Sequence, residues 1–111
     1  MEKEISRKIV DELLTYYYMH DIQEIKIGIS FLSEGLYIEL QGETPAPPED
    51  MAEFSASLQV PREAYLEEYY LEMLGDIHHE RENYHVLGSL IDDVELFFDE
   101  PIFAVKVFRR G

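Results

Sequence analysis

The sequence predicts an α+β domain, a two-layer α/β sandwich with helices on one face of a mixed or antiparallel sheet. Apolar residues recur at helical spacing in the first 20 residues, and two pairs of later segments alternate with the period of a strand. Strand-like and helix-like segments are segregated along the chain rather than alternating. A chain of 111 residues has the length of one domain, so we expect a single domain over 1–111.

The first segment, residues 2 to about 20, is predicted to be a helix. Its apolar stripe recurs every four residues, at Ile5, Ile9, Leu13 and Tyr17. Three consecutive tyrosines, 16–18, end this helix. Because successive residues point 100° apart, these rings cannot share one face, and at least one should approach solvent.

A β-hairpin should follow. Residues 25–31 and 36–40 alternate apolar and polar side chains, and Ser33-Glu34-Gly35 lies between them as a turn. The next stretch, 42–61, contains Pro45, Pro47, Pro48 and Pro61, so it is predicted to be a Pro-rich loop region. Within it, Pro48 could open a short helix that runs to about residue 57.

The second half predicts two more helices and a second hairpin. The helices are expected over 63–77 and 84–92, separated by a polar connector. The closing hairpin pairs 94–98 with 102–108 around a turn at 99–101.

Composition narrows the possible partners. Nine Lys and Arg against 24 Asp and Glu give a net charge of −15, which disfavours nucleic acid and anionic membranes. The chain has no cysteine, so disulfides, Cys-based zinc sites and thiol catalysis are excluded. No apolar run approaches the ~20 residues of a membrane span, and the first residues lack a signal-peptide pattern. We therefore expect a cytoplasmic protein.

The element order and the string Val-Asp-Glu-Leu-Leu-Thr-Tyr-Tyr-Tyr-Met-His over 10–20 resemble the histidine-kinase-like (GHKL) ATPase fold. The closest resemblance is to sensor histidine kinase catalytic domains and anti-sigma factor kinases. It implies that Glu12 lies where the family has its catalytic Glu, which polarises the attacking water or hydroxyl. Tyr16 falls on the magnesium-binding Asn, and His20 on a His at the helix end. A phenol is a poor magnesium ligand.

The same resemblance places the other nucleotide-binding positions. It puts Gln41 on the Asp that accepts from the adenine amino group, and Glu43 and Pro45 on two glycines that approach the nucleotide. Asn83 falls in the phosphate-binding loop, where no glycine stands. These substitutions lead us to expect little or no ATP binding, with Tyr16 in or over the former nucleotide site.

The expected function is therefore that of a degenerate histidine-kinase-like domain, a regulatory protein-binding module in bacterial signalling. We expect no enzymatic activity, no cofactor and no metal, and a protein partner with a basic surface. The alternative is an ATP-binding sensor histidine kinase or anti-sigma factor serine kinase domain with an atypical pocket, using Mg-ATP as a protein kinase or ATPase. Under the first hypothesis Glu12 is a helix residue at the exposed edge of the apolar stripe; under the second it is a general base.

Two other sets of residues allow two interpretations each. Tyr65, Tyr69 and Tyr70 either line a partner-binding surface or pack in the core with their hydroxyls at the surface. The run 78–80, His-His-Glu, either binds a metal or forms a solvated connector, and its spacing favours the connector.

We also expect a homodimer. The closing strand, 102–108, is apolar on both faces, and both it and the first hairpin could lie at a sheet edge, where an apolar strand would invite pairing. The resemblance instead implies that this strand lies inside the sheet. The tyrosine-rich helix, 63–77, is the second candidate surface.

Overall fold

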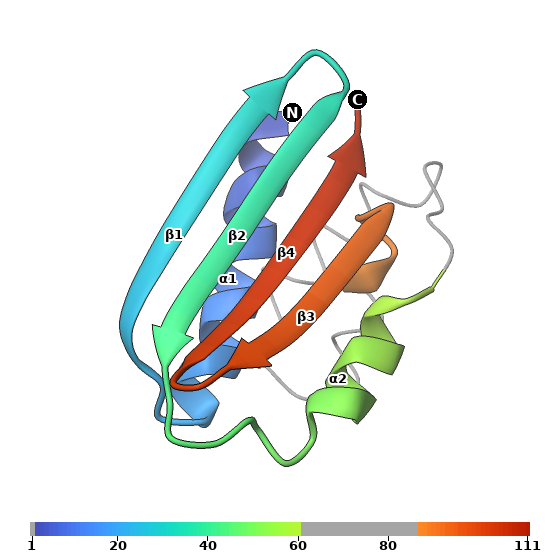
Figure 1. Cartoon of the computed structure of the whole chain (residues 1–111). Coiled ribbons are helices and arrows are strands. Elements are labelled where there is room, and N and C mark those ends of the chain that lie inside the picture. Colours follow the sequence, from blue (N-terminus) through green and yellow to red (C-terminus); the bar gives the residue numbers. More distant parts are fainter. Residues whose placement is uncertain (1, 61–86) are drawn as a thin grey trace.

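The computed structural model describes residues 2–60 and 87–111 and places two helices and four strands in them (Figure 1). In chain order these are α1(Glu2–Met19), β1(Gln23–Leu32), β2(Gly35–Glu43), α2(Met51–Leu58), β3(Asp93–Asp99) and β4(Ile102–Arg110). The helix predicted over 63–77 and most of the one over 84–92 lie outside the described residues. The α+β prediction is confirmed for the part of the chain that the structure describes.

Helix α1 forms as its apolar stripe predicts. Ile5, Ile9, Leu13 and Tyr17 are fully buried against the sheet. The three tyrosines at its end separate as the helical spacing requires, because Tyr16 and Tyr17 are buried whereas Tyr18 is 64% exposed. Neither α1 nor α2 is long and apolar enough to cross a membrane.

The first hairpin matches its prediction, although both strands extend beyond the predicted ends. Its register pairs Leu32 with Gly35 and Ile29 with Ile38. Gly35 adopts a φ of +151°. A Cβ there would collide with the carbonyl oxygen of Arg109, so the close approach of β4 to this turn requires glycine.

The four strands form one antiparallel sheet in the order β1-β2-β4-β3. The expectation that the closing strand lies at a sheet edge is wrong, because β4 pairs with β2 on one side and β3 on the other. Two hairpins joined by their later strands place β2 and β4 in the middle. The edges of the described sheet are β1 and β3.

Helices α1 and α2 lie on the same side of the sheet, and the core fills the space between (Figure 1). The strands contribute alternate residues to it: Leu36, Ile38 and Leu40 from β2, and Phe103, Val105 and Val107 from β4. Helix α2 begins at Met51, three residues after Pro48, and adds Phe54 and Leu58. The predicted helix over 84–92 ends early, because Leu87 and Gly88 are helical and a turn follows.

Arg109 ties both ends of the chain to the core. It is 3% exposed, its Nε donates to Oε1 of Glu2 at 3.2 Å, and a guanidinium nitrogen donates to the carbonyl of Leu90 at 2.8 Å. A buried guanidinium is tolerated only when its donors are used, as they are here. This contact fixes the start of α1 beside the end of β4.

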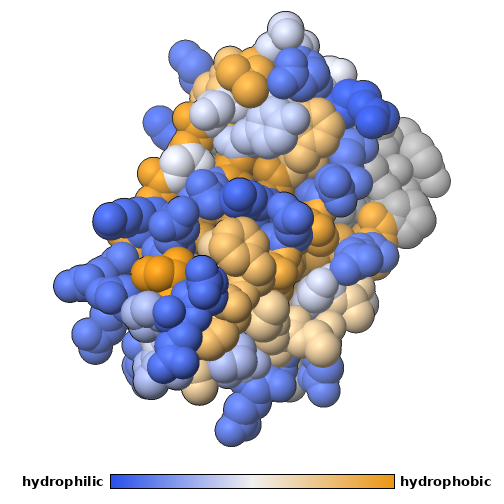
Figure 2. All heavy atoms as spheres, viewed as in Figure 1, coloured by the Kyte–Doolittle hydropathy of each residue, from blue (hydrophilic) through white to orange (hydrophobic). Residues whose placement is uncertain are grey.

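The other sheet face is open. Charged side chains, blue in Figure 2, surround apolar ones in orange, and orange atoms reach the outer margin along the upper part of β1. On this face Lys106 lies 3.7 Å from Glu39 and 5.3 Å from the ring centre of Phe97. Tyr37 and Phe108 pack with ring centres 4.7 Å apart. An exposed ion pair such as Lys106–Glu39 stabilises a fold little.

Candidate functional site

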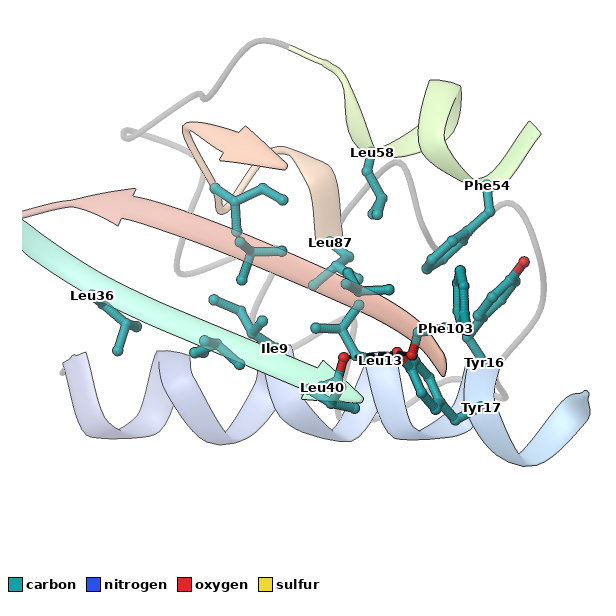
Figure 3. Packing of buried hydrophobic residues seen from close by; sticks show 14 of the residues in the cluster. Ile9, Leu13, Tyr16, Tyr17, Leu36, Leu40, Phe54, Leu58, Leu87 and Phe103 are labelled. Atoms are coloured by element: carbon teal, nitrogen blue, oxygen red, sulfur yellow. Dashed lines mark hydrogen bonds between the residues drawn. The ribbon is translucent and has the colours of Figure 1, made fainter. Parts of the chain in front are cut away.

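The junction between the end of α1 and the start of α2 brings together the best-defined polar cluster outside the arginine contact. Tyr16 stacks on Phe54, with ring centres 3.6 Å apart and planes 6° from parallel (Figure 3). Its hydroxyl donates to Oδ1 of Asp50 at 2.7 Å. Because the ring is 1% exposed, Tyr16 occupies the space between the two helices rather than bordering an open cavity.

His20 completes this cluster one helical turn later. Its Nε2 lies 3.1 Å from the same Asp50 oxygen, and its ring centre lies 4.5 Å from that of Tyr16. Asp50 thus receives a phenol hydrogen bond and faces an imidazole, which forms an ion pair with it when protonated. The sequence places Tyr16 and His20 together because they are four residues apart on one helix flank.

A pocket of about 350 Å³ opens beside this cluster. Its lining combines the end of α1 with the Pro-rich loop: His20, Thr44, Ala46, Pro47, Pro48, Glu49 and Asp50. Among the described residues of this lining, two are acids and none is Lys or Arg, so their field repels phosphate groups. The volume is near the lower limit for small-molecule sites, and the charge favours a neutral or cationic group.

Glu12 lies one turn before Tyr16, on the same flank of α1. Its exposed fraction is 1%, so the expectation of a helix residue at the exposed edge of the stripe is wrong. Residue type alone favours solvent for a carboxylate, but at 100° per residue position 12 lies within about 40° of both Ile5 and Tyr16, at the edge of the buried arc.

Gln41 and Glu43 lie on the opposite sheet face. Along β2 the buried residues Leu40 and Gly42 alternate with these two, so both side chains point away from the helices. The Gln41 amide donates to Oε2 of Glu39 at 3.2 Å.

On the open face, the carboxylate of Glu24 shifts the pKa of Glu43. A hydrogen bond with Glu24, followed by the charge of that carboxylate, raises the pKa of Glu43 above its ordinary value. The structure therefore brings Glu12 and Tyr16 together on the helix side but leaves Gln41 and Glu43 on the open side.

The remaining candidate residues fall outside the described ranges. These are Asn83, the tyrosines Tyr65, Tyr69 and Tyr70, and the run 78–80. Within 2–60 and 87–111, no group of three or more His, Asp or Glu side chains could hold a metal ion.

Sequence reasoning missed the role of Asp50. The sequence pattern places it only near the start of the short helix predicted after Pro48, whereas its side chain connects that helix to α1 through Tyr16. A usable signal existed, because a buried tyrosine needs a hydroxyl partner. The partner's position, 34 residues away, depends on the path of the Pro-rich loop.

Comparisons with family models, with curated proteins and with solved structures found no match to this chain.

Proposed function

We propose that this chain is a histidine-kinase-like (GHKL) domain of degenerate type, in which side-chain packing replaces the nucleotide site. In this proposal it acts in bacterial signalling as a regulatory module that binds a protein with a basic surface. It is not an enzyme and uses no cofactor.

The order of the strands supports the fold part of the proposal. The resemblance implies a closing strand inside the sheet, and β4 does lie between β2 and β3. The first helix followed by a hairpin, and a second hairpin at the end of the described chain, agree with the implied element order. Strand order is a demanding criterion, because four strands can be arranged in many ways.

The packing of Tyr16 is the observation that carries the functional part. Its position corresponds to the magnesium-binding Asn of the family, yet its ring lies flat against Phe54 and its hydroxyl is used by Asp50. A magnesium ion needs oxygen ligands in near-octahedral geometry, which a buried, stacked phenol does not provide. Removing the ring from this stack would also create a cavity, so the packing stabilises the closed arrangement.

The placement of Gln41 and Glu43 supports the same conclusion. A site that holds one nucleotide needs its adenine and magnesium contacts on one side of the sheet. Here Gln41 and Glu43 lie on the open face, whereas Tyr16 lies on the helix side. The two acids that line the neighbouring pocket add repulsion toward a triphosphate. Glu12 then has no bound phosphoryl donor to act on.

Calorimetric titration of the full chain with Mg-ATP tests the absence of nucleotide binding. We expect no saturable heat at millimolar nucleotide. Micromolar affinity would overturn the degenerate site and favour the alternative, an ATP-binding kinase domain. The variant Tyr16→Asn, which restores the family residue, should also fail to bind because Gln41 and Glu43 still face away.

The charge part is tested with a lysine decapeptide as a defined basic probe. We expect binding to the full chain at about 0.01 M salt and its loss at about 1 M, because the Debye length shortens from about 30 Å to about 3 Å. A matched glutamate decapeptide should not bind at either salt concentration. Lysine-peptide binding that is absent at low salt would contradict a basic partner.

A further inference from the structure

In the part of the chain that the structure describes, strand β1 combines an unpaired backbone edge with an apolar face that α1 and α2 leave uncovered. Within the described residues β1 pairs with β2 alone, so its outer edge presents unpaired N–H and C=O groups. The register sets Ile27, Ile29 and Phe31 opposite Leu40, Ile38 and Leu36 on the helix side of the sheet. The β2 residues are at most 1% exposed, whereas those of β1 are 43%, 45% and 52% exposed.

The position of α1 explains this difference. Tyr16 faces α2, which lies on the β3 side of the sheet (Figure 1). At 100° per residue, Val10 and Leu14 lie on the opposite flank of α1, toward β1, and both are only partly buried. Together with Ile27, Ile29 and Phe31 they form what we call the β1 surface.

We propose that the β1 surface is a homodimer interface, in which the β1 strands of two copies pair antiparallel about a two-fold axis near Gly28. This pairing joins the two sheets into one continuous sheet and places Ile27 of each copy beside Ile29 of the other. It also sets Phe31 beside Ile25 of the second copy. The apolar faces of both strands then lie on the same side and continue the core.

Charge favours a second copy over a basic partner at this position. The chain carries −15 overall, but Lys26 is the single charged residue from 25 to 32. With the axis near Gly28, Lys26 lies opposite Ser30 of the second copy and no like charges meet. A basic partner protein would find no acidic side chain to pair with among the residues that form the β1 surface.

The form of β1 leaves its later half open to pairing. The register shifts between Gln23 and Lys26, and Glu24 has a φ of +53°, so a bulge and a charge protect the start of the strand. From Lys26 to Leu32 the pairing with β2 is regular. Two such strands, with the apolar side chains of both β1 surfaces, bury on the order of 1,000 Å² in total, the lower size of specific interfaces.

Of the two segments expected at a sheet edge, the first hairpin does place β1 at an edge of the described sheet, whereas the closing strand β4 lies inside it. The homodimer interface is independent of the proposed function, since nucleotide binding is measured separately and at a different place.

Light scattering coupled to gel filtration tests the dimer with the full chain. We expect twice the chain mass of 13.1 kDa at micromolar concentration. Ile29→Lys introduces a charge into each copy's half of the contact and should raise the dissociation constant more than ~100-fold, giving a monomer. Phe97→Lys is the matched control. It adds the same charge at a residue that is 37% exposed on the open face of β3, and it should remain dimeric.

Hydrogen exchange separates loss of the dimer from loss of the fold. In Ile29→Lys the amides of 27–31 should lose protection while those of β2 and β4 keep it. A wild-type monomer at about 100 µM, a dimeric Ile29→Lys, or an equal effect of Phe97→Lys would each overturn the proposal.

Discussion

Strands β1 and β2 are hydrogen-bonded neighbours with the same apolar alternation, yet they have opposite environments. Leu40 of β2 is fully buried beneath α1, while Ile27, opposite it on β1, is 43% exposed. The two strands have the same alternation of apolar residues, but only β2 has its apolar face buried by the rest of the chain. Alternation therefore identifies the apolar face of a strand but does not tell whether the same chain covers it.

The largest difference should appear when one side chain is truncated in each environment. Leu13→Ala removes a fully buried side chain beneath the sheet and should cost about 2–5 kcal/mol in the free energy of unfolding. Ile29→Ala on β1 should cost less than ~1.5 kcal/mol because its side chain is already 45% exposed. Urea denaturation at low protein concentration measures both. Equal losses would mean that β1 is covered in solution even in the monomer.

Replacing one glycine by alanine on each strand compares the space around β1 and β2. A Cβ at Gly42 of β2 would collide with Ile22 and approach Cε2 of Tyr17 to 3.2 Å, whereas nothing lies within 4 Å of a Cβ at Gly28 of β1. Gly42→Ala should therefore cost about 1–3 kcal/mol. Gly28→Ala should be neutral or stabilising by up to ~1 kcal/mol. The melting temperatures of the two variants should fall on opposite sides of the wild type or differ by several degrees.

A smaller loss of stability is expected when the Tyr17 hydroxyl, which contacts both central strands, is removed. The Tyr17 hydroxyl lies within donating distance of the carbonyls of Leu40, at 2.9 Å, and Phe103, at 3.1 Å, beneath β2 and β4. Tyr17→Phe should cost about 1–2 kcal/mol because a buried hydrogen bond is lost. Tyr18→Phe, at the adjacent exposed position, should change stability by less than ~0.5 kcal/mol. A similar cost for both would contradict the burial of Tyr17.

The smallest effect lies on the open face. The hydrogen bond and charge of Glu24 raise the pKa of Glu43, so the pair favours the fold when Glu43 is protonated. That contribution is present below the ordinary value of 4.5 and is lost as pH rises through the higher folded pKa. Glu43→Gln should slightly raise the melting temperature at pH 7, and the gain should disappear in acid. Glu100→Gln is the control for charge reduction alone, and it should show no such pH dependence.

Local patterns predicted most of the described elements. The period of four placed α1, the period of two placed both hairpins, and Gly35 with its preceding turn residues located the first turn. These signals are local because each depends on side chains only a few residues apart. Sheet order is not local, which is why the sequence alone allowed the closing strand to lie at an edge.

The candidate site was less predictable for the same reason. Glu12 is buried and Asp50 joins two helices, but both facts depend on contacts between segments far apart in the chain. The face on which Gln41 and Glu43 lie could have been read from the alternation of β2. The strand that supports Leu36, Ile38 and Leu40 in the core necessarily turns its odd-numbered residues outward.

The phenol of Tyr17 also sets an upper limit to the conditions under which the chain stays folded. Burial raises its pKa well above the ordinary value of 10.0, so the folded state holds a proton that the unfolded state releases in alkali. Above about pH 10 each further unit of pH therefore favours unfolding by up to ~1.4 kcal/mol from this one group. Alkaline denaturation of this chain is therefore coupled to the loss of a single buried phenolic proton.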